Sequence, residues 1–260
     1  AELVEEYDPC AGSPAPAVCR CALEFPPVTY DPSVEFVLST GESGTYDLAT
    51  GRTLMNLVRA IVVAAEPASV PEGGTPIKLY ANPPATPDAM ANLNSVVKRN
   101  PNFAEAELVD TMMMPRSIGG MADRLYGGIW WLPDTKTLVV VFRGTQTPFE
   151  WYLDTQCESH RRISGTFDVA FGFGTGYLFC QEALVNATRT HQPSRVVIGG
   201  HSLGGAIAAT AALDLHERSK SAGMPYSVHA MTFGQPRTFA PDAAKVADEA
   251  IMSGTLELWR

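Results

Sequence analysis

The stretch VVIGGHSLGGAIAATAAL, residues 196–213, most constrains the fold, because an apolar strand passes there into a helix of small residues. The turn between them reads Gly-x-Ser-x-Gly, from Gly200 to Gly204, and neighbouring backbone comes so close in such a corner that only small residues fit on both sides. The corner holds the Ser202 hydroxyl above the sheet edge and points the Leu203 amide toward any oxyanion formed there. We interpret Ser202 as a candidate nucleophile. The alternative is a glycine-rich turn with an incidental serine.

Strands and helices alternate through the second half of the chain, which predicts an α/β fold with a central, mostly parallel sheet flanked by helices. The expected strands are residues 125–131, 138–144, 195–200, 227–234 and 255–260, and the expected helices are residues 53–65, 88–98, 173–189, 203–218 and 240–252. The first two strands are separated by a Pro-Asp-Thr-Lys turn and should form a hairpin. Three methionines at 112–114 are expected to fill core space at a loop end, with a substrate wall as the alternative.

Composition narrows the class of protein. The chain has 260 residues, of which 45% are hydrophobic and 18% charged, so it should fold around a core. A net charge of −9, without a lysine and arginine cluster, speaks against nucleic-acid binding, and no apolar run approaches the ~18 residues of a membrane span. We expect a proline- and cysteine-rich arm over residues 1–50 and one α/β domain over residues 51–260.

The cysteines suggest an oxidising compartment. Three of five lie within the first 21 residues, which predicts a disulfide-tied arm and a secreted protein; buried free thiols are the alternative. The odd count leaves one cysteine over. A glycosylation sequon at Asn186 fits secretion. No second ligand pair accompanies the Cys-x-Cys sequence, so no metal site is expected.

Four spaced motifs resemble the class 3 lipases, the fungal-type triacylglycerol lipase family. They are FRGT at 142–145, a tryptophan and an aspartate at Trp151 and Asp154, GHSLGGA at 200–206, and GQPR at 234–237. The resemblance covers roughly residues 126–260. It implies an α/β-hydrolase-like fold, a serine ester hydrolase, and no metal or organic cofactor.

The resemblance also implies roles for individual residues. Ser202 would be the nucleophile that is acylated, and Thr145 would complete the oxyanion hole with its amide and hydroxyl beside the Leu203 amide. Residues 146–156 would be a lid with an apolar face that meets lipid when it opens, formed by Phe149, Trp151, Tyr152 and Leu153. The alternative for that segment is a surface helix packed on the core. Arg143 and Asp154 are expected as a structural ion pair or as turn anchors, and His201 as a structural hydrogen-bonding residue.

The sequence departs from the family pattern in two places. Residues 169–173 read VAFGF, where the family often has V-H-x-G-F, and Thr-Phe-Ala follows the GQPR motif where the family favours V-G-D/N. Both positions are structural in the family, so these departures bear on local packing more than on catalysis.

A serine nucleophile needs a histidine base and an orienting carboxylate, and the residues after Ser202 do not supply them. His216 lies 14 residues along the expected helix, about 21 Å away. His229 lies about 16 Å below the carboxyl end of its strand. The aspartates at 214, 242 and 248 fall on helices rather than at strand ends. The family places its aspartate just after the strand that begins here as LELWR and its histidine later, so we expect both beyond Arg260, in a truncated sequence.

The sequence therefore predicts a secreted lipase that hydrolyses acylglycerols through an acyl-enzyme on Ser202, with lipid or another ester as its partner. A phospholipase or a feruloyl-type esterase of the same fold is an open alternative. So is a catalytically inactive lipid-binding or interaction protein that keeps the corner as scaffold.

Overall fold

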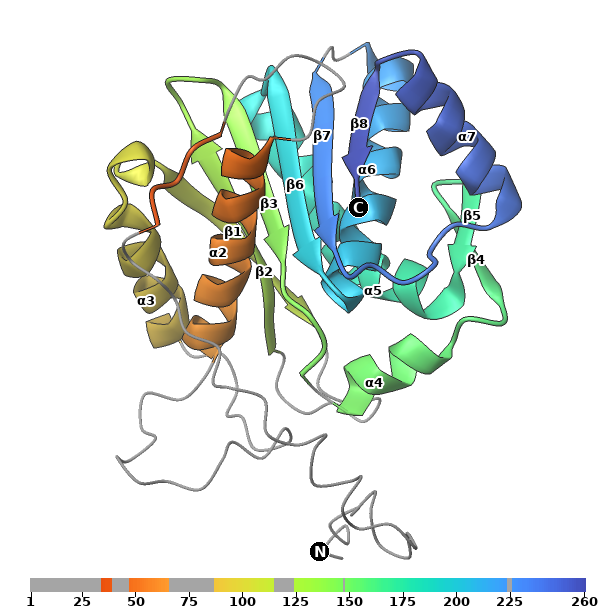
Figure 1. Ribbon diagram of the computed structural model, residues 1–260, viewed down its shortest axis with the longest axis horizontal. Coiled ribbons are helices and arrows are strands. Elements are labelled where there is room, and N and C mark those ends of the chain that lie inside the picture. Colours follow the sequence, from red (N-terminus) through yellow and green to blue (C-terminus); the bar gives the residue numbers. More distant parts are fainter. Residues whose placement is uncertain (1–33, 39–46, 66–86, 115–123, 147, 224–225) are drawn as a thin grey trace, which may run out of the picture.

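A computed structural model describes residues 34–38, 47–65, 87–114, 124–146, 148–223 and 226–260, and its centre is a six-stranded sheet in the order β1-β2-β3-β6-β7-β8 (Figure 1). The strands are β1 (Glu107–Met114), β2 (Arg124–Leu132), β3 (Thr137–Phe142), β6 (Arg195–His201), β7 (Ser227–Phe233) and β8 (Leu256–Trp259). The last four are parallel, and β1, β2 and β3 pair antiparallel. A separate hairpin joins β4 (His160–Ile163) to β5 (Phe167–Ala170).

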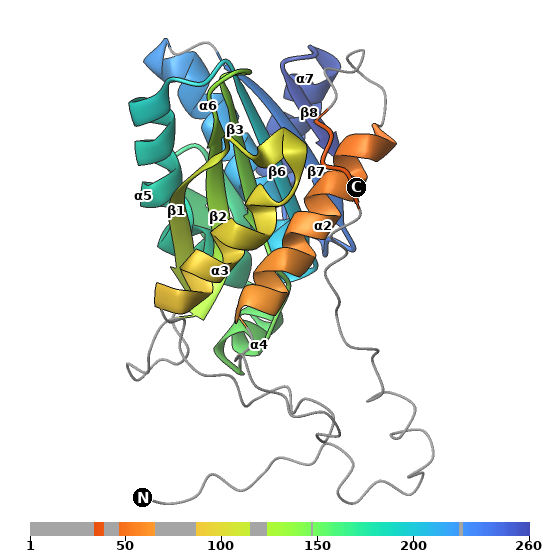
Figure 2. The same cartoon turned by 90° about the vertical axis from the view of Figure 1, so that its left-hand side faces the viewer.

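Helices cover both faces of the sheet (Figures 1 and 2). One face carries α2 (Leu48–Ala65) and α3 (Pro87–Lys98), followed by the short 3-10 turn η1 (Pro101–Phe103); the other carries α5 (Phe171–His191), α6 (Leu203–Ala222) and α7 (Pro241–Met252). The short α4 (Pro148–Thr155) lies at the carboxyl ends of the parallel strands, below the sheet in Figure 1. The α/β prediction, with a mostly parallel sheet flanked by helices, is confirmed.

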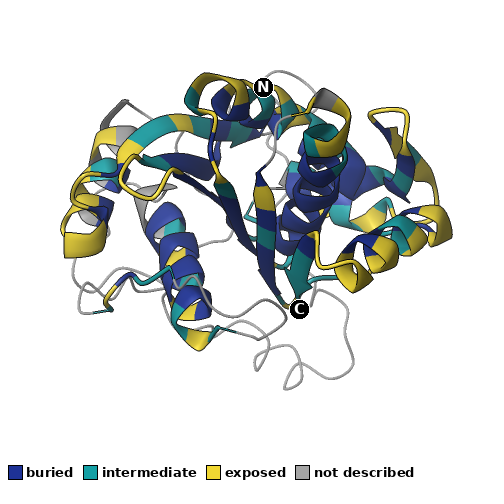
Figure 3. Ribbon diagram, turned by 90° about the horizontal axis from the view of Figure 1, so that it is seen from above, coloured by how far each residue is buried: buried dark blue, intermediate teal, exposed yellow. Residues whose placement is uncertain are grey.

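Burial explains why the central strands lack an alternating pattern. All six residues of β3 are buried, because Leu138, Val140 and Phe142 pack under α5 and α6 while Val139 and Val141 pack under α2. Figure 3 shows the same arrangement from above, with buried strands between helices that expose only their outer sides. The sheet is thus a rigid support for whatever lies at the carboxyl ends of its strands.

The predicted hairpin is confirmed, since β2 and β3 pair from Gly127 with Phe142 to Leu132 with Thr137. The methionines at 112–114 are not at a loop end, however. They lie within β1, paired with β2, and their side chains alternate: Met112 and Met114 pack on the α5 and α6 side, and Met113 on the α2 side. Their role as core residues is confirmed, while the loop assignment is wrong because the antiparallel pairing extends the sheet by one strand.

The proposed boundary at residue 51 falls inside α2. Phe36 is fully buried in the core under α2, and the Val37 amide donates a hydrogen bond to Thr53 Oγ1 at 2.8 Å. We therefore propose that the domain begins at or before residue 34. Residues 1–33, with the cysteines of the predicted arm, lie outside the described residues. Among described cysteines, Cys157 is an exposed thiol and Cys180 a buried one.

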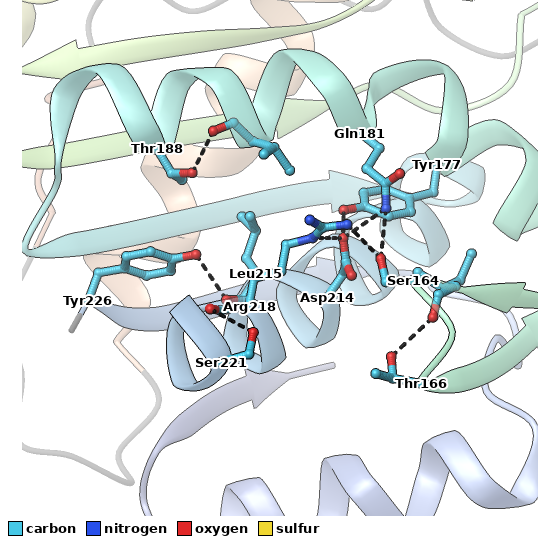
Figure 4. Close-up of polar contacts among 12 residues, drawn as sticks. Ser164, Thr166, Tyr177, Gln181, Thr188, Asp214, Leu215, Arg218, Ser221 and Tyr226 are labelled. Carbon is cyan, nitrogen blue, oxygen red and sulfur yellow. Dashed lines mark hydrogen bonds and ion pairs between the residues drawn. The ribbon is translucent and has the colours of Figure 1, made fainter. Parts of the chain in front are cut away.

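A buried carboxylate ties two helices and the small hairpin together (Figure 4). Asp214 Oδ2, on α6, accepts hydrogen bonds from Tyr177 Oη at 2.6 Å, Gln181 Nε2 at 3.0 Å and Arg218 Nε at 2.8 Å. Arg218 and Gln181 also reach Ser164 Oγ in the turn between β4 and β5. Asp214 is therefore engaged in a structural network, which agrees with its exclusion as a catalytic acid.

Candidate active site

Ser202 forms the corner between β6 and α6 with a backbone conformation that is rare outside glycine. Its φ is 53° and its ψ −123°. The corner is fixed from both sides, because the Ser202 amide donates to the Phe233 carbonyl at 2.9 Å and the Ser202 carbonyl accepts from the Gly205 amide at 2.8 Å. The end of β7 and the first turn of α6 therefore hold the serine in place at a local energetic cost, as observed where a strained backbone serves function.

The two glycines of the motif are required by close backbone contacts. A Cβ on Gly200 would lie 2.1 Å from the Gly204 carbonyl oxygen, and a Cβ on Gly204 would lie 2.2 Å from the Arg143 carbonyl oxygen. A Cβ on Gly144 would lie 3.5 Å from Ser202 Cβ, so the chain leaving β3 passes directly beside the serine. The sequence prediction that this corner needs small residues is thus explained atom by atom.

Thr145 follows β3, but its hydroxyl is already engaged. Thr145 Oγ1 donates a hydrogen bond of 2.7 Å to Asp154 Oδ2 on α4. This bond holds α4 to the strand end beside Ser202. While Asp154 is ionised, the hydroxyl donates to it and could contribute to an oxyanion hole only by releasing that carboxylate.

Arg143 and Glu150 form a fully buried ion pair behind the serine. The guanidinium nitrogens Nη1 and Nη2 lie 2.9 and 2.8 Å from the two carboxylate oxygens of Glu150, and Nε donates to the Leu125 carbonyl at 2.8 Å. Of the two expected roles, an ion pair between Arg143 and Asp154 is wrong, whereas both residues do form structural contacts, Arg143 with Glu150 and Asp154 with Thr145. Glu150 and Asp154 are one helical turn apart on the same face of α4, and Glu150, in the first turn, lies closer to the arginine.

The environment of Asp154 favours its neutral form. Burial raises the pKa of its carboxyl from 3.8 to about 6; the hydrogen bond from Thr145 opposes that rise and the negative charge of Glu150 adds to it. A carboxyl group that changes charge near pH 6 thus lies at the contact between α4 and the serine loop.

The four residues of the predicted lid face divide into two pairs. Leu153 is buried in the core and Phe149 is partly buried against it, while Trp151 and Tyr152 are 48% and 46% exposed. The Phe149 ring lies 6.4 Å from the Tyr152 ring and 6.2 Å from the ring of Phe179 on α5. Phe179, itself 45% exposed, was missed because its pattern is that of an ordinary helix residue.

All five histidines of the sequence are described, and none forms a hydrogen bond with the Ser202 hydroxyl in this part of the chain. His229 contacts Glu257, His216 is buried in α6, the His191 ring lies 5.0 Å from Trp131, and His160 begins β4. His201 immediately precedes the serine, and burial lowers the pKa of its imidazole.

A mostly parallel sheet flanked by helices, with a strained serine between a strand and the amino end of a helix, is the arrangement of the α/β-hydrolase fold. Comparison with known proteins narrows this class. The pattern of the family Lipase (class 3) matches residues 139–257, which run from β3 into β8. This segment is therefore similar to the class 3 lipases.

The individual relatives match this chain over only part of their length. A lipase of Rhizomucor miehei is 35% identical over 112 residues, which cover 41% of this chain and 30% of that protein. The chain thus spans less than a third of this curated relative. Among solved structures, the native Rhizomucor miehei lipase propeptide complex is 24% identical, with coverage of 58% of this chain and 47% of that chain and a TM-score of 0.43. The Lip2 lipase from Yarrowia lipolytica is 19% identical, with coverage of 84% and 68% and a TM-score of 0.47.

Proposed function

We propose that the protein is a carboxylic ester hydrolase in which Ser202 is the nucleophile. The observation that carries this proposal is the backbone of Ser202, held at a φ of 53° between two glycines that nothing larger could replace. A strained serine at the amino end of a helix is costly, and it is typical of sites where the hydroxyl must face a substrate.

In the proposed reaction, Ser202 Oγ attacks the ester carbonyl carbon, the alcohol leaves, and water then releases the acid from the acyl-enzyme. The Leu203 amide, in the first turn of α6, and the Thr145 amide would stabilise the oxyanion. The step also needs a histidine base and an orienting carboxylate. Among the described residues, no histidine is hydrogen-bonded to the Ser202 hydroxyl.

Acylglycerols are the proposed substrates, hydrolysed by a secreted enzyme at a lipid–water interface. The half-exposed Trp151 and Tyr152 support this choice, because a helix that presents aromatic rings beside the serine suits contact with lipid when it moves. The described helices include none that is both long and apolar enough to span a bilayer.

The proposal is tested on the protein as its natural source makes it, after its intact mass has been compared with the 27.9 kDa of this chain. Hydrolysis of emulsified triacylglycerol, phosphatidylcholine and methyl ferulate is measured for the wild type and for Ser202→Ala. We expect triacylglycerol to be the best substrate and the variant to lose activity about 10⁴-fold or more, with an unchanged unfolding midpoint.

Preference for phosphatidylcholine or methyl ferulate would replace the lipase proposal by a phospholipase or a feruloyl-type esterase. Wild-type turnover in Ser202→Ala would overturn the nucleophile. An inactive wild type that still binds triacylglycerol emulsions would favour a lipid-binding scaffold.

A further inference from the structure

A second serine lies at the opposite edge of the sheet, where the parallel strands begin. Ser227 is the first residue of β7 and is exposed. Its Oγ lies 3.0 Å from Nε2 of His229, two residues further along the strand. Nδ1 of the same imidazole lies 2.8 Å from Glu257 Oε2 on the adjacent strand β8. A serine, a histidine and a carboxylate are therefore joined in one chain of contacts.

The order of the atoms fixes the direction of hydrogen bonding. A glutamate accepts hydrogen bonds, so the neutral imidazole of His229 carries its proton on Nδ1 and donates it to Glu257. Nε2 then has a free lone pair and accepts from the Ser227 hydroxyl. This is the tautomer that a general base needs, with the carboxylate orienting the ring and able to stabilise the imidazolium.

The sheet register places all three groups on one face. The neighbours Val228 and Leu256 pack on the α5 and α6 side, so Ser227, His229 and Glu257 point to the α2 side. The side chains of His229 and Glu257 are 24% and 18% exposed, which leaves the group open to small molecules but partly shielded from water.

A cation borders this group. Arg195, the first residue of β6, is the register partner of Ser227, and its side chain therefore points to the same face. Its Nε is buried without a hydrogen-bond partner among the described residues. Burial lowers the pKa of the guanidinium, and the negative charges of Glu257 and Asp47 oppose that change. A positively charged side chain is thus rooted on the same face, on the strand next to Ser227.

We propose that Ser227, His229 and Glu257 form a second nucleophilic site, which accepts acyl or phosphonyl groups from small reagents with good leaving groups. Among the described residues, Ser227 has no strained backbone and no pair of amides aimed at its hydroxyl, so the site suits activated esters rather than triacylglycerols. The inference stands independently of the proposed function of Ser202.

The proposed reaction needs only Ser227 as nucleophile, His229 as base and the leaving group of the reagent. Ser227 Oγ forms a bond to the carbonyl carbon of an aryl ester or to the phosphorus of a fluorophosphonate, and its proton passes to His229 Nε2. The bond to the leaving group breaks, and phenolate or fluoride departs with the electron pair. His229 then gives this proton to solvent and becomes neutral again. In deacylation, the neutral imidazole takes a proton from the water that attacks the acyl carbon and passes it to Ser227 Oγ as the bond to the acyl group breaks and the acid leaves.

The test uses the full-length protein with Ser202→Ala, so that the corner serine cannot react. The protein is incubated with an alkyl fluorophosphonate, and modification of each serine is followed by peptide mass spectrometry. We expect Ser227 to react at least tenfold faster than Ser253, an exposed serine whose hydroxyl contacts the Ala250 carbonyl instead of a histidine. His229→Gln should remove this advantage, and Glu257→Gln should reduce it several-fold.

Equal rates at Ser227 and Ser253, or an unchanged Ser227 rate in His229→Gln, would overturn the proposal. Circular dichroism and the unfolding midpoint of each variant establish that loss of labelling is not loss of fold. Because Ser202 and Ser227 lie in different peptides, labelling of the unsubstituted chain reports separately on the two sites.

Discussion

The two edges of the sheet each present a serine, and they differ in what surrounds it. At the carboxyl edge, Ser202 has a strained backbone, a helix amino end behind it and no histidine within hydrogen-bond distance among the described residues. At the amino edge, Ser227 has a histidine and a carboxylate in line but lies in an ordinary strand. A backbone that presents a serine and side chains that can activate one are therefore separate features, and the described residues place the first at Ser202 and the second at Ser227.

The two edges also differ in how strongly their stability depends on buried contacts. The carboxyl edge depends on contacts that tolerate no added atom and on an ion pair with no exposure, whereas the amino edge depends on side chains that are partly exposed. Substitutions should consequently be far more damaging at the first edge, and the predictions below follow from the largest effect to the smallest.

The largest effect is expected for Gly204→Ala. Its new methyl group would lie 2.2 Å from the Arg143 carbonyl oxygen, and backbone on both sides cannot yield. We expect the free energy of unfolding, measured by urea denaturation, to fall by more than about 3 kcal/mol. Gly254→Ala is the matched control: its φ is 69° but no atom lies within 4 Å, so it should cost about 1 kcal/mol. Equal losses would refute the close-contact explanation.

Next comes the buried ion pair. Glu150→Gln leaves the Arg143 charge buried without its carboxylate and should cost about 3 kcal/mol in urea denaturation. Glu257→Gln removes the carboxylate of the partly exposed pair with His229 at the other edge and should cost less than about 1 kcal/mol. If the two losses were similar, burial would not be what distinguishes the edges.

A smaller effect concerns pH. The pKa of Asp154 is about 6 in the folded protein and 3.8 as the ordinary value, so the folded state holds this proton more tightly than the unfolded chain. That contribution to stability is complete below about pH 4 and is lost as pH rises through about 6. Solvent screening limits it to about 1 kcal/mol. Urea denaturation of the wild type should show this decline, and Asp154→Asn, which cannot ionise, should show a flatter profile.

The smallest effect is expected for the aromatic contact that holds α4 against α5. Phe179→Leu keeps an apolar side chain but removes the edge-to-face contact with Phe149, 6.2 Å between ring centres. A double-mutant cycle with Phe149→Leu should give a coupling of about 0.5 kcal/mol. A coupling near zero would mean that the hydrogen bond from Thr145 and the ion pair alone fix α4.

At the amino edge, Ser227→Ala should change the free energy of unfolding by less than about 0.5 kcal/mol.

Local sequence was enough to predict the parts of the fold that repeat a simple pattern. The β2–β3 hairpin, the buried β6 and the small-residue helix α6 follow from apolar runs, a turn sequence and glycine spacing. The strand β1 did not, because three consecutive methionines carry no alternating pattern from which a strand could be predicted. The hairpin β4–β5 is short and mostly polar on one strand, so it resembled a loop.

Sequence could name the residues of the candidate site but not their contacts. Ser202, Thr145 and the α4 segment each lie in a motif, and their functional roles stay a prediction. The sequence could not tell that Arg143 pairs with Glu150 rather than with Asp154, since both acids lie on the same face of one short helix and only the approach of β3 decides between them. The contact of His229 with Glu257 could not be predicted from sequence either, because only the pairing of β7 with β8 brings the two residues together.

The strand order has a consequence for the time at which the corner forms. Val141 on β3 pairs with Gly199 on β6, 58 residues later, and the Ser202 amide is held by Phe233, a further strand away. Contacts between residues so far apart in sequence form slowly, because a long loop must close first. On the ribosome, the strained corner therefore stays unlocked until β7 has emerged, and until then the apolar strands β3 and β6 depend on one another, or on chaperones, for protection from aggregation.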